Sequence, residues 1–261
     1  MNIAVTAAAS PRWLTNTVAA ALRQTAIVVV GCGIAGALVG GIGSRLVMRL
    51  SALAAPEVRG SLTENGNVVG DITFFGTIGL MLFAGVASAI FGAGAYTVVG
   101  PWLPGSTVTR GLVFGSFVLA LLGSSVVDPN NADFVILGDR VLNVAMFSAL
   151  FIAFGLVASG AIAFLEGRVP RAIERSPRAW VLVVVCALPI VPGLAAVTLG
   201  FAAWRGVALV GAWAAMVASG ALARQGLQGA ARLLRLAATG VLVIVLALAG
   251  ADYVDGVATI L

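Results

Sequence analysis

The chain has 261 residues, of which 61% are hydrophobic and only 10% are charged, and its formal net charge at pH 7 is +5. Soluble domains are about 25% charged, so this chain has too few polar side chains to cover its surface in water. The composition excludes a soluble enzyme, a nucleic-acid-binding module and a disordered regulator, and it predicts an all-α integral membrane protein.

Seven stretches are apolar over the roughly 20 residues that a membrane-crossing helix needs. In chain order they cover residues 26–46, 72–99, 111–127, 141–165, 179–201, 207–223 and 236–250. Ser10-Pro11 predicts a short interfacial helix ahead of the first span, because serine caps helices and proline fits their first turn. Pro101 is expected to end the second span. The predicted fold is therefore a polytopic bundle of about seven transmembrane helices.

The arginines predict the orientation of this bundle. With a cytoplasmic N-terminus, ten of the fifteen arginines fall in inner segments, whereas eight of the ten acidic residues fall in outer ones. The positive-inside rule thus favours a cytoplasmic N-terminus and an extracytoplasmic C-terminus. The composition is typical of multi-pass proteins of GC-rich bacteria, so we expect the chain in the bacterial cytoplasmic (inner) membrane. We divide it into an N-terminal segment (1–25), a four-helix part (26–165), an arginine-rich cytoplasmic loop (166–178) and a three-helix part (179–261).

Several residue types that carry chemistry are missing. The sequence contains no histidine, and all fifteen basic residues are arginine. This excludes metal or haem ligation by histidine, a histidine general base and a Schiff-base lysine. The two cysteines, Cys32 and Cys186, lie in apolar runs and are too few for an iron–sulfur site. We predict no cofactor and no metal centre, and we find no enzyme motif such as a Walker loop.

The two longer outer loops, 57–71 and 128–133, are rich in carboxylate and asparagine side chains. Their oxygens suit Ca²⁺ or Mg²⁺, but the spacing of an EF-hand is absent, and solvated, capped loops explain the same composition. Asn65-Gly66 in the first of these loops predicts a tight hairpin between the residues that flank it.

Small residues recur every four positions in several spans, as at Gly36 and Gly40 in the first and at Gly155 and Ser159 in the fourth. This spacing places them on one face of each helix, where they let two backbones approach closely. Such faces fit packing within one chain and packing in a homo-oligomer equally well.

Arg45 and Arg49 are four residues apart, so they share a helix face at the outer end of the first span. Their position opposes the positive-inside trend, which indicates that they pair with something. Candidate partners are Asp71, Asp128, Asp139 and the outer end of the seventh span. We interpret the group as a structural ion-pair network or, alternatively, as a site for an anion or a lipid head group.

Asp252 and Asp255 lie three residues apart after the last apolar stretch. Paired acids near a membrane can share a proton and serve a function. The alternative is that both side chains lie in water beyond the end of the span.

Pro189, Pro192 and Gly193 interrupt the fifth span near its middle. Such residues free backbone carbonyls, as in the broken helices of transporters. A simple kink is the alternative.

Three functions remain open at this stage. The number of spans, the interrupted fifth span and the polar outer loops favour a small-solute or ion permease or a channel-like protein. Spans without charged residues and small-residue faces favour an accessory or scaffold subunit of a larger membrane complex. A weaker hypothesis is a membrane enzyme that acts on a lipid or envelope precursor. The expected partners are the lipid bilayer and, in the second case, other membrane subunits or further copies of the chain, but no nucleic acid.

Overall fold

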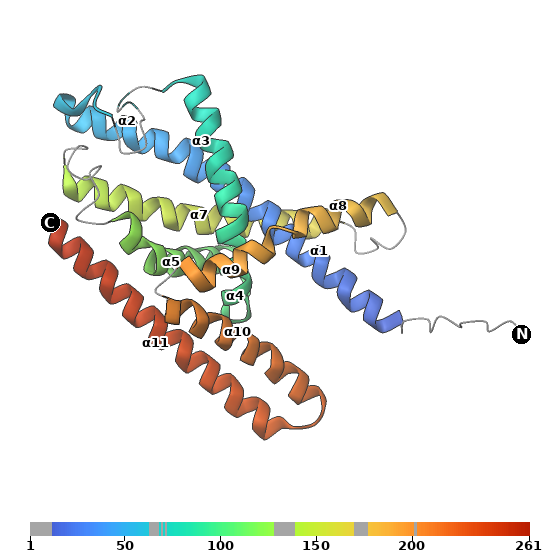
Figure 1. Cartoon of the computed structure of the whole chain (residues 1–261). Coiled ribbons are helices and arrows are strands. Elements are labelled where there is room, and N and C mark those ends of the chain that lie inside the picture. Colours follow the sequence, from blue (N-terminus) through green and yellow to red (C-terminus); the bar gives the residue numbers. More distant parts are fainter. Residues whose placement is uncertain are drawn as a thin grey trace, which may run out of the picture.

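The computed structural model describes residues 12–62, 68, 70, 72–127, 139–169, 177–200 and 203–261, and in these ranges the chain consists of helices and their connections (Figure 1). The one exception is an isolated antiparallel bridge between Leu62 and Val68. These two residues flank the predicted hairpin, although Asn65-Gly66 itself lies outside the described residues.

Two of the spans contain π-helical turns between α-helical parts. The first span runs without a break through α1, η1 and α2, and the second runs through α3, η3 and α4 before a 3₁₀ turn that contains Pro101. The bounds of these elements are α1 (Arg12–Ala35), η1 (Gly36–Gly43), α2 (Ser44–Ala54), η2 (Pro56–Val58), α3 (Phe74–Ala87), η3 (Ser88–Gly92), α4 (Ala93–Val99) and η4 (Gly100–Trp102).

The rest of the chain is α-helical where it is described. The elements are α5 (Thr107–Val126), α7 (Arg140–Arg168), α8 (Pro177–Ala187), α9 (Ile190–Gly200), α10 (Ala203–Arg224) and α11 (Gln228–Ile260). Three of the helix starts have a side-chain cap, in which Thr73, Ser106 or Asp139 accepts a hydrogen bond from a backbone N–H of the first turn.

Seven helices in the described residues are long and apolar enough to cross a membrane, which confirms the predicted all-helical bundle. They are Val18–Ala54, Phe74–Trp102, Thr107–Val126, Arg140–Arg168, Trp180–Val197, Trp204–Arg224 and Gln228–Ile260. The first and the last extend well beyond the apolar stretches at 26–46 and 236–250. At 37 and 33 residues they extend over roughly 50 Å or more, whereas the hydrocarbon core of a bilayer is about 30 Å thick.

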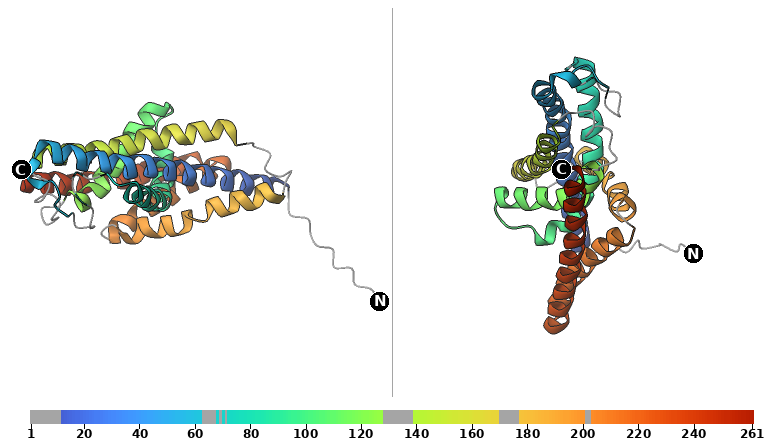
Figure 2. Two further views of the ribbon diagram at one scale, coloured as in Figure 1. Left: turned by 90° about the horizontal axis from the view of Figure 1, so that it is seen from above. Right: turned by 90° about the vertical axis from the view of Figure 1, so that its left-hand side faces the viewer.

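The long first span and α7 run in opposite directions along the bundle, whereas the second span crosses them (Figure 2). The start of α1, the end of α7 and the start of α8 lie at one end, which we call the N-terminal end. The end of α2, the start of α7 and the end of α11 lie at the other, which we call the C-terminal end (Figures 1 and 2).

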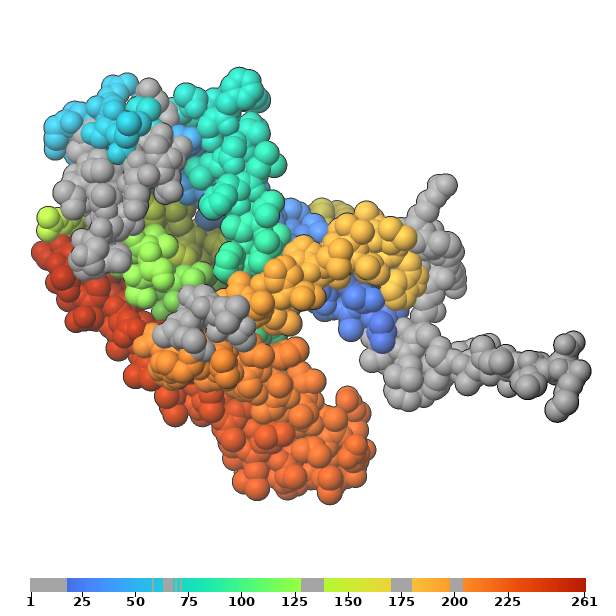
Figure 3. All heavy atoms as spheres, viewed as in Figure 1, coloured from blue at the N-terminus to red at the C-terminus, as the bar shows by residue number. Residues whose placement is uncertain are grey.

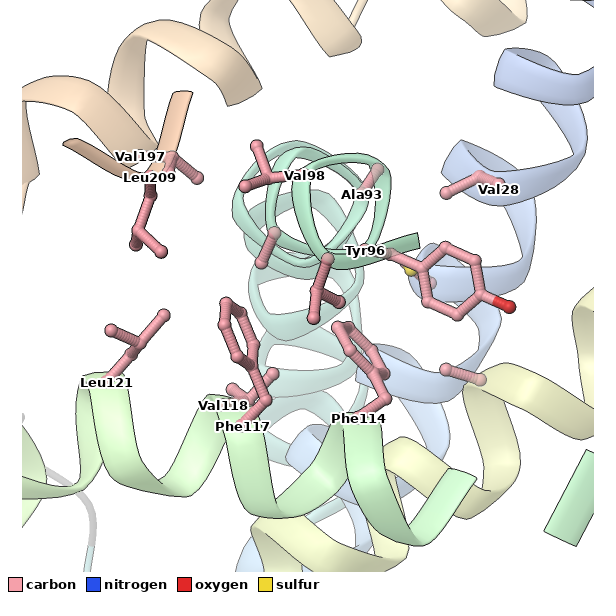
Figure 4. Packing of buried hydrophobic residues seen from close by; sticks show 14 of the residues in the cluster. Val28, Ala93, Tyr96, Val98, Phe114, Phe117, Val118, Leu121, Val197 and Leu209 are labelled. Carbon is pink, nitrogen blue, oxygen red and sulfur yellow. The ribbon is translucent and has the colours of Figure 1, made fainter. Parts of the chain in front are cut away.

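The main core lies where α1, α4, α5, α9 and α10 meet (Figure 4). Buried side chains from different helices form one cluster there, and they include Val28, Phe114, Phe117, Leu209 and the ring of Tyr96. By contrast, α3 packs chiefly on η1 and has no buried residue, so most of its large apolar side chains face outward.

Glycine permits a close helix crossing between α5 and α7. A Cβ at Gly155 would overlap backbone atoms of Gly111 and Gly115, and a Cβ at Gly111 would lie 2.7 Å from the Cα of Leu156. The small-residue face that the sequence predicts in the fourth span is therefore used within the chain, against glycines of α5.

Candidate functional site

The two arginines of the predicted outer cluster lie at the C-terminal end of the bundle. Arg45 is 5% exposed, and its guanidinium lies against the first turn of α3 at Gly76, where a Cβ would overlap it. Arg49 donates from Nη1 to the carbonyl oxygen of Gly70 at 2.6 Å. Both side chains thus connect α2 to the residues around the start of α3.

The predicted carboxylate partners of this pair contact other groups or lie outside the described residues. Asp139 accepts a hydrogen bond from the backbone nitrogen of Leu142 at 3.1 Å and caps α7. Asp71 and Asp128 lie outside the described residues. The ion-pair network around Arg45 and Arg49 therefore stays a prediction.

Asp252 and Asp255 both lie within α11, where their environments differ. Asp252 forms an ion pair with Arg205 of α10 at 2.6 Å, and their side chains are 51% and 18% exposed. Asp255 is exposed, and its carbonyl oxygen accepts a hydrogen bond from Thr259. Asp252 thus contacts a guanidinium of the neighbouring helix.

The fifth span is interrupted where the prolines predict it. The helix α8 ends at Ala187, and α9 begins at Ile190 after a turn at Leu188 and Pro189, while Pro192 lies within α9. At Gly193 the backbone of α9 lies directly against Ile90 and Gly94, and a Cβ on Gly94 would lie 2.5 Å from the Gly193 carbonyl oxygen. The break is thus held against the π-helical region of the second span.

A polar cavity of about 380 Å³ lies among α1, α4 and the start of α5. Its polar lining comes from Gln24, Thr25, Tyr96, Thr97 and Arg110, and no acidic residue lines it among the described residues. We call it the polar cavity. Because it is formed by the early part of the first span, the end of the second and the start of the third, it lies toward the N-terminal end.

A second cavity of about 460 Å³ lies farther toward the C-terminal end, and we call it the apolar cavity. It is formed by η1 and the start of α2, by η3 with the end of α3, by α5 and by α7. Ser44 and Ser88 are the polar side chains that line it among the described residues. The molecular surface is recessed between α3 and α5, where atoms of α7 lie deeper (Figure 3). Four phenylalanines line this cavity: Phe91, Phe147, Phe151 and Phe154.

Three aromatic rings lie between the two cavities. The Tyr96 ring, in the wall of the polar cavity, meets Phe114 edge-on with a centroid separation of 4.9 Å. Phe114 in turn lies 5.9 Å from Phe154, which lines the apolar cavity. Phe114 is fully buried, and the Tyr96 hydroxyl points away from the apolar core (Figure 4). We call Tyr96, Phe114 and Phe154 the aromatic layer.

The two π-helical segments lie beside this layer and contact each other. At Gly36 the backbone of η1 approaches η3 so closely that a Cβ would overlap the side chain of Ser88. At Gly92, the last residue of η3, a Cβ would lie 2.9 Å from the Phe154 ring. Because π-helical turns are rare and often mark functional sites, this contact is where we expect the bundle to change shape.

The sequence prediction missed the residues of both cavities. Arg110 was counted only as one of ten inner arginines, and Phe114 and Phe154 look like any other phenylalanine of an apolar span. One signal was available at Tyr96, because the chain has only two tyrosines and this one follows a long apolar run. A buried tyrosine usually hydrogen-bonds through its hydroxyl, so it indicates a polar group nearby.

Comparisons with protein-family models, with curated proteins and with solved structures returned no match for this chain.

Proposed function

We propose that the chain is a membrane permease for a small solute, with a passage between its first four spans. The observation that carries this proposal is the pair of cavities on either side of the aromatic layer, inside one set of four helices. Both volumes fall within the range of about 300–1,000 Å³ that is typical of ligand pockets. In this conformation the aromatic layer closes the passage.

Interrupted helices support the same proposal. Many transporters place their substrate site near the middle of the membrane, beside helices that are locally broken. Here the turn at Leu188 and Pro189 leads into Gly193, which packs against the second span where η3 meets α4. Movement of α9 would therefore act directly on the helix that carries Tyr96.

Flux through proteoliposomes tests the proposal. We would follow the entry of glycerol, urea and sodium phosphate by light scattering, with gramicidin present to carry sodium. The wild type is expected to admit at least one of these solutes faster than empty liposomes do. Phe114→Ala should raise that rate further, because it removes the middle ring of the aromatic layer.

Phe117→Ala is the matched control for this experiment. Phe117 lies one turn along α5 and is buried in the same core, but among the described residues the ring pairs of the aromatic layer are those of Phe114 with Tyr96 and Phe154. Both substitutions lose a buried phenyl ring, at a cost of about 3–5 kcal/mol, so size-exclusion chromatography must show that both variants are folded. Flux that is equal in the two variants, or equal to that of empty liposomes, would contradict the permease.

The proposed orientation places the N-terminal end, and with it the polar cavity, on the cytoplasmic side. Cysteine labelling in a Cys32→Ala, Cys186→Ala background tests it. Glu57 and Gln225 are exposed, after α2 and between α10 and α11 respectively. Glu57→Cys should react with an impermeant maleimide on intact spheroplasts, and Gln225→Cys only after permeabilisation. The reverse pattern would invert the orientation.

The accessory-subunit hypothesis is favoured by one surface, the outward face of α3. Phe74, Phe75 and Phe83 project from it, and Phe75 is 86% exposed. Lipid or a partner helix would cover such a face equally well. A second polypeptide at fixed stoichiometry, found by native mass spectrometry after gentle extraction, would favour this alternative over the permease.

A further inference from the structure

We propose that the polar cavity binds an oxyanion group, a carboxylate or a phosphate, with Arg110 supplying the positive charge and Tyr96 a neutral donor. This inference names the substrate class of the proposed permease and therefore rests partly on that function. Binding of an oxyanion in the polar cavity does not require transport, so the binding site and the permease can be tested separately.

Arg110 is held in position at the cavity wall. It lies in the first turn of α5, and its Nε donates to the carbonyl oxygen of Pro104 at 3.0 Å. That bond uses one of the five N–H groups of the guanidinium. A planar fork with several donors matches the two oxygens of a carboxylate or phosphate better than it matches a spherical ion such as chloride.

No described acidic residue forms an ion pair with Arg110 within 4.0 Å. Arg205 and Asp252 form an ion pair, but they lie at the other end of the bundle. Glu166 is the acidic residue associated with this region, and its Oε1 accepts a hydrogen bond from Gln24 at 2.7 Å. Glu166 also acts electrostatically on Tyr96. Arg110 is nevertheless the one charged residue in the described lining of the cavity, so the lining favours an anion over a cation.

The remaining lining suits an anion as well. Tyr96 is 6% exposed, and its hydroxyl lies within electrostatic range of the Arg110 guanidinium. Thr25 and Thr97 add two hydroxyl groups, and Gln24 adds an amide. These groups donate hydrogen bonds without adding charge, so one cation with neutral donors fits a group of about one negative charge.

Other occupants fit less well. A cation would lie beside the guanidinium and be repelled, and a neutral solute would leave the arginine without a counter-charge. An oxyanion has two natural sources here, a free anion in water or the phosphate of a lipid head group. The chemistry at Arg110 is the same for both, and the experiment separates them.

The test measures thermal unfolding of the full chain in detergent at constant ionic strength. Sodium phosphate and sodium acetate are titrated against sodium chloride, and in a separate arm phosphatidylglycerol is compared with phosphatidylcholine in the micelle. We expect saturable stabilisation by at least one oxyanion and none by chloride. Stabilisation by the salts assigns a free anion, whereas stabilisation by phosphatidylglycerol alone supports the oxyanion site and assigns it to a lipid.

Variants then locate the binding site. Arg110→Gln should weaken the apparent affinity about ten- to hundredfold, because it removes a charge-assisted partner. Arg232→Gln makes the same change at an exposed arginine of α11 and should leave the affinity unchanged. Tyr96→Phe keeps the ring contact with Phe114 and should weaken binding about two- to tenfold.

Arg110→Lys is a second variant, which keeps the proposal testable if Arg110→Gln fails to fold. It keeps the charge but not the planar fork, and an intermediate affinity is expected. The proposal is overturned if no oxyanion stabilises the protein more than chloride does, or if Arg110→Gln and Arg110→Lys both bind like the wild type. Binding that depends on Arg110 without any flux would overturn only the permease, and glycerol flux without oxyanion binding would overturn only this inference.

Discussion

The glycine crossing between α5 and α7 makes a prediction that isolates a steric effect. In Gly155→Ala the new methyl group would overlap backbone atoms of Gly111 and Gly115. Backbone cannot rotate away as a flexible side chain does, so the two helices must separate. Overpacking of this kind costs about 1–3 kcal/mol, while alanine gains up to about 1 kcal/mol in helix propensity over glycine.

Gly160→Ala is the matched control on the same helix, because a Cβ at Gly160 meets nothing within 4 Å. Both substitutions gain the same propensity, so the difference in their free energies of unfolding measures the steric term alone. We expect Gly155→Ala to be less stable than Gly160→Ala by about 1–3 kcal/mol in reversible unfolding by dodecyl sulfate in mixed micelles. A difference below about 0.5 kcal/mol would refute the tight crossing.

Two further predictions concern polar contacts. Asp252→Asn should destabilise the fold by less than about 1 kcal/mol, because the Asp252 side chain is 51% exposed in its ion pair with Arg205. A double-mutant cycle with Arg205→Gln measures the coupling energy of the pair, and a value well above about 1 kcal/mol would contradict this prediction. Ser51→Ala should cost about 1–3 kcal/mol, because it removes a buried 2.9 Å hydrogen bond to Oδ1 of Asn143. Ser116→Ala, at an exposed position of α5, should be neutral in the same unfolding assay, and equal effects of the two serine variants would argue against the buried bond.

The helical bundle follows from local properties of the chain, and for that reason the sequence predicts it well. A long apolar run in lipid must satisfy its own backbone hydrogen bonds, which leaves a helix as the only open-chain solution. The ends of the spans are predicted less well, because a helix does not stop where its apolar residues stop. The last helix continues past residue 250, where its apolar stretch ends, and includes Asp252 and Asp255.

The partner of Asp252 shows why site residues are harder to predict. The sequence alone suggested the outer carboxylates as partners for Arg45 and Arg49 and treated Asp252 with Asp255 as a pair. In the structure Asp252 pairs with Arg205, because α10 and α11 are joined by a short turn and pack antiparallel along each other. A short connection does predict antiparallel neighbours, so this contact was accessible to sequence reasoning. The cavities were not, since each is formed by residues from three or four different spans.

Described polar contacts join neighbouring segments at both ends of the bundle, and this bears on the proposed permease. At the C-terminal end they join neighbouring segments: Arg49 to Gly70, Arg140 to the carbonyl of Ile260, and Arg205 to Asp252. At the N-terminal end Arg23 of α1 donates to the carbonyl oxygens of Glu166 and Val169 at the end of α7. Arg110 lines the polar cavity at the same end. In the permease that we propose, the aromatic layer separates the polar cavity from the apolar one, and contacts of this kind must break at whichever end opens.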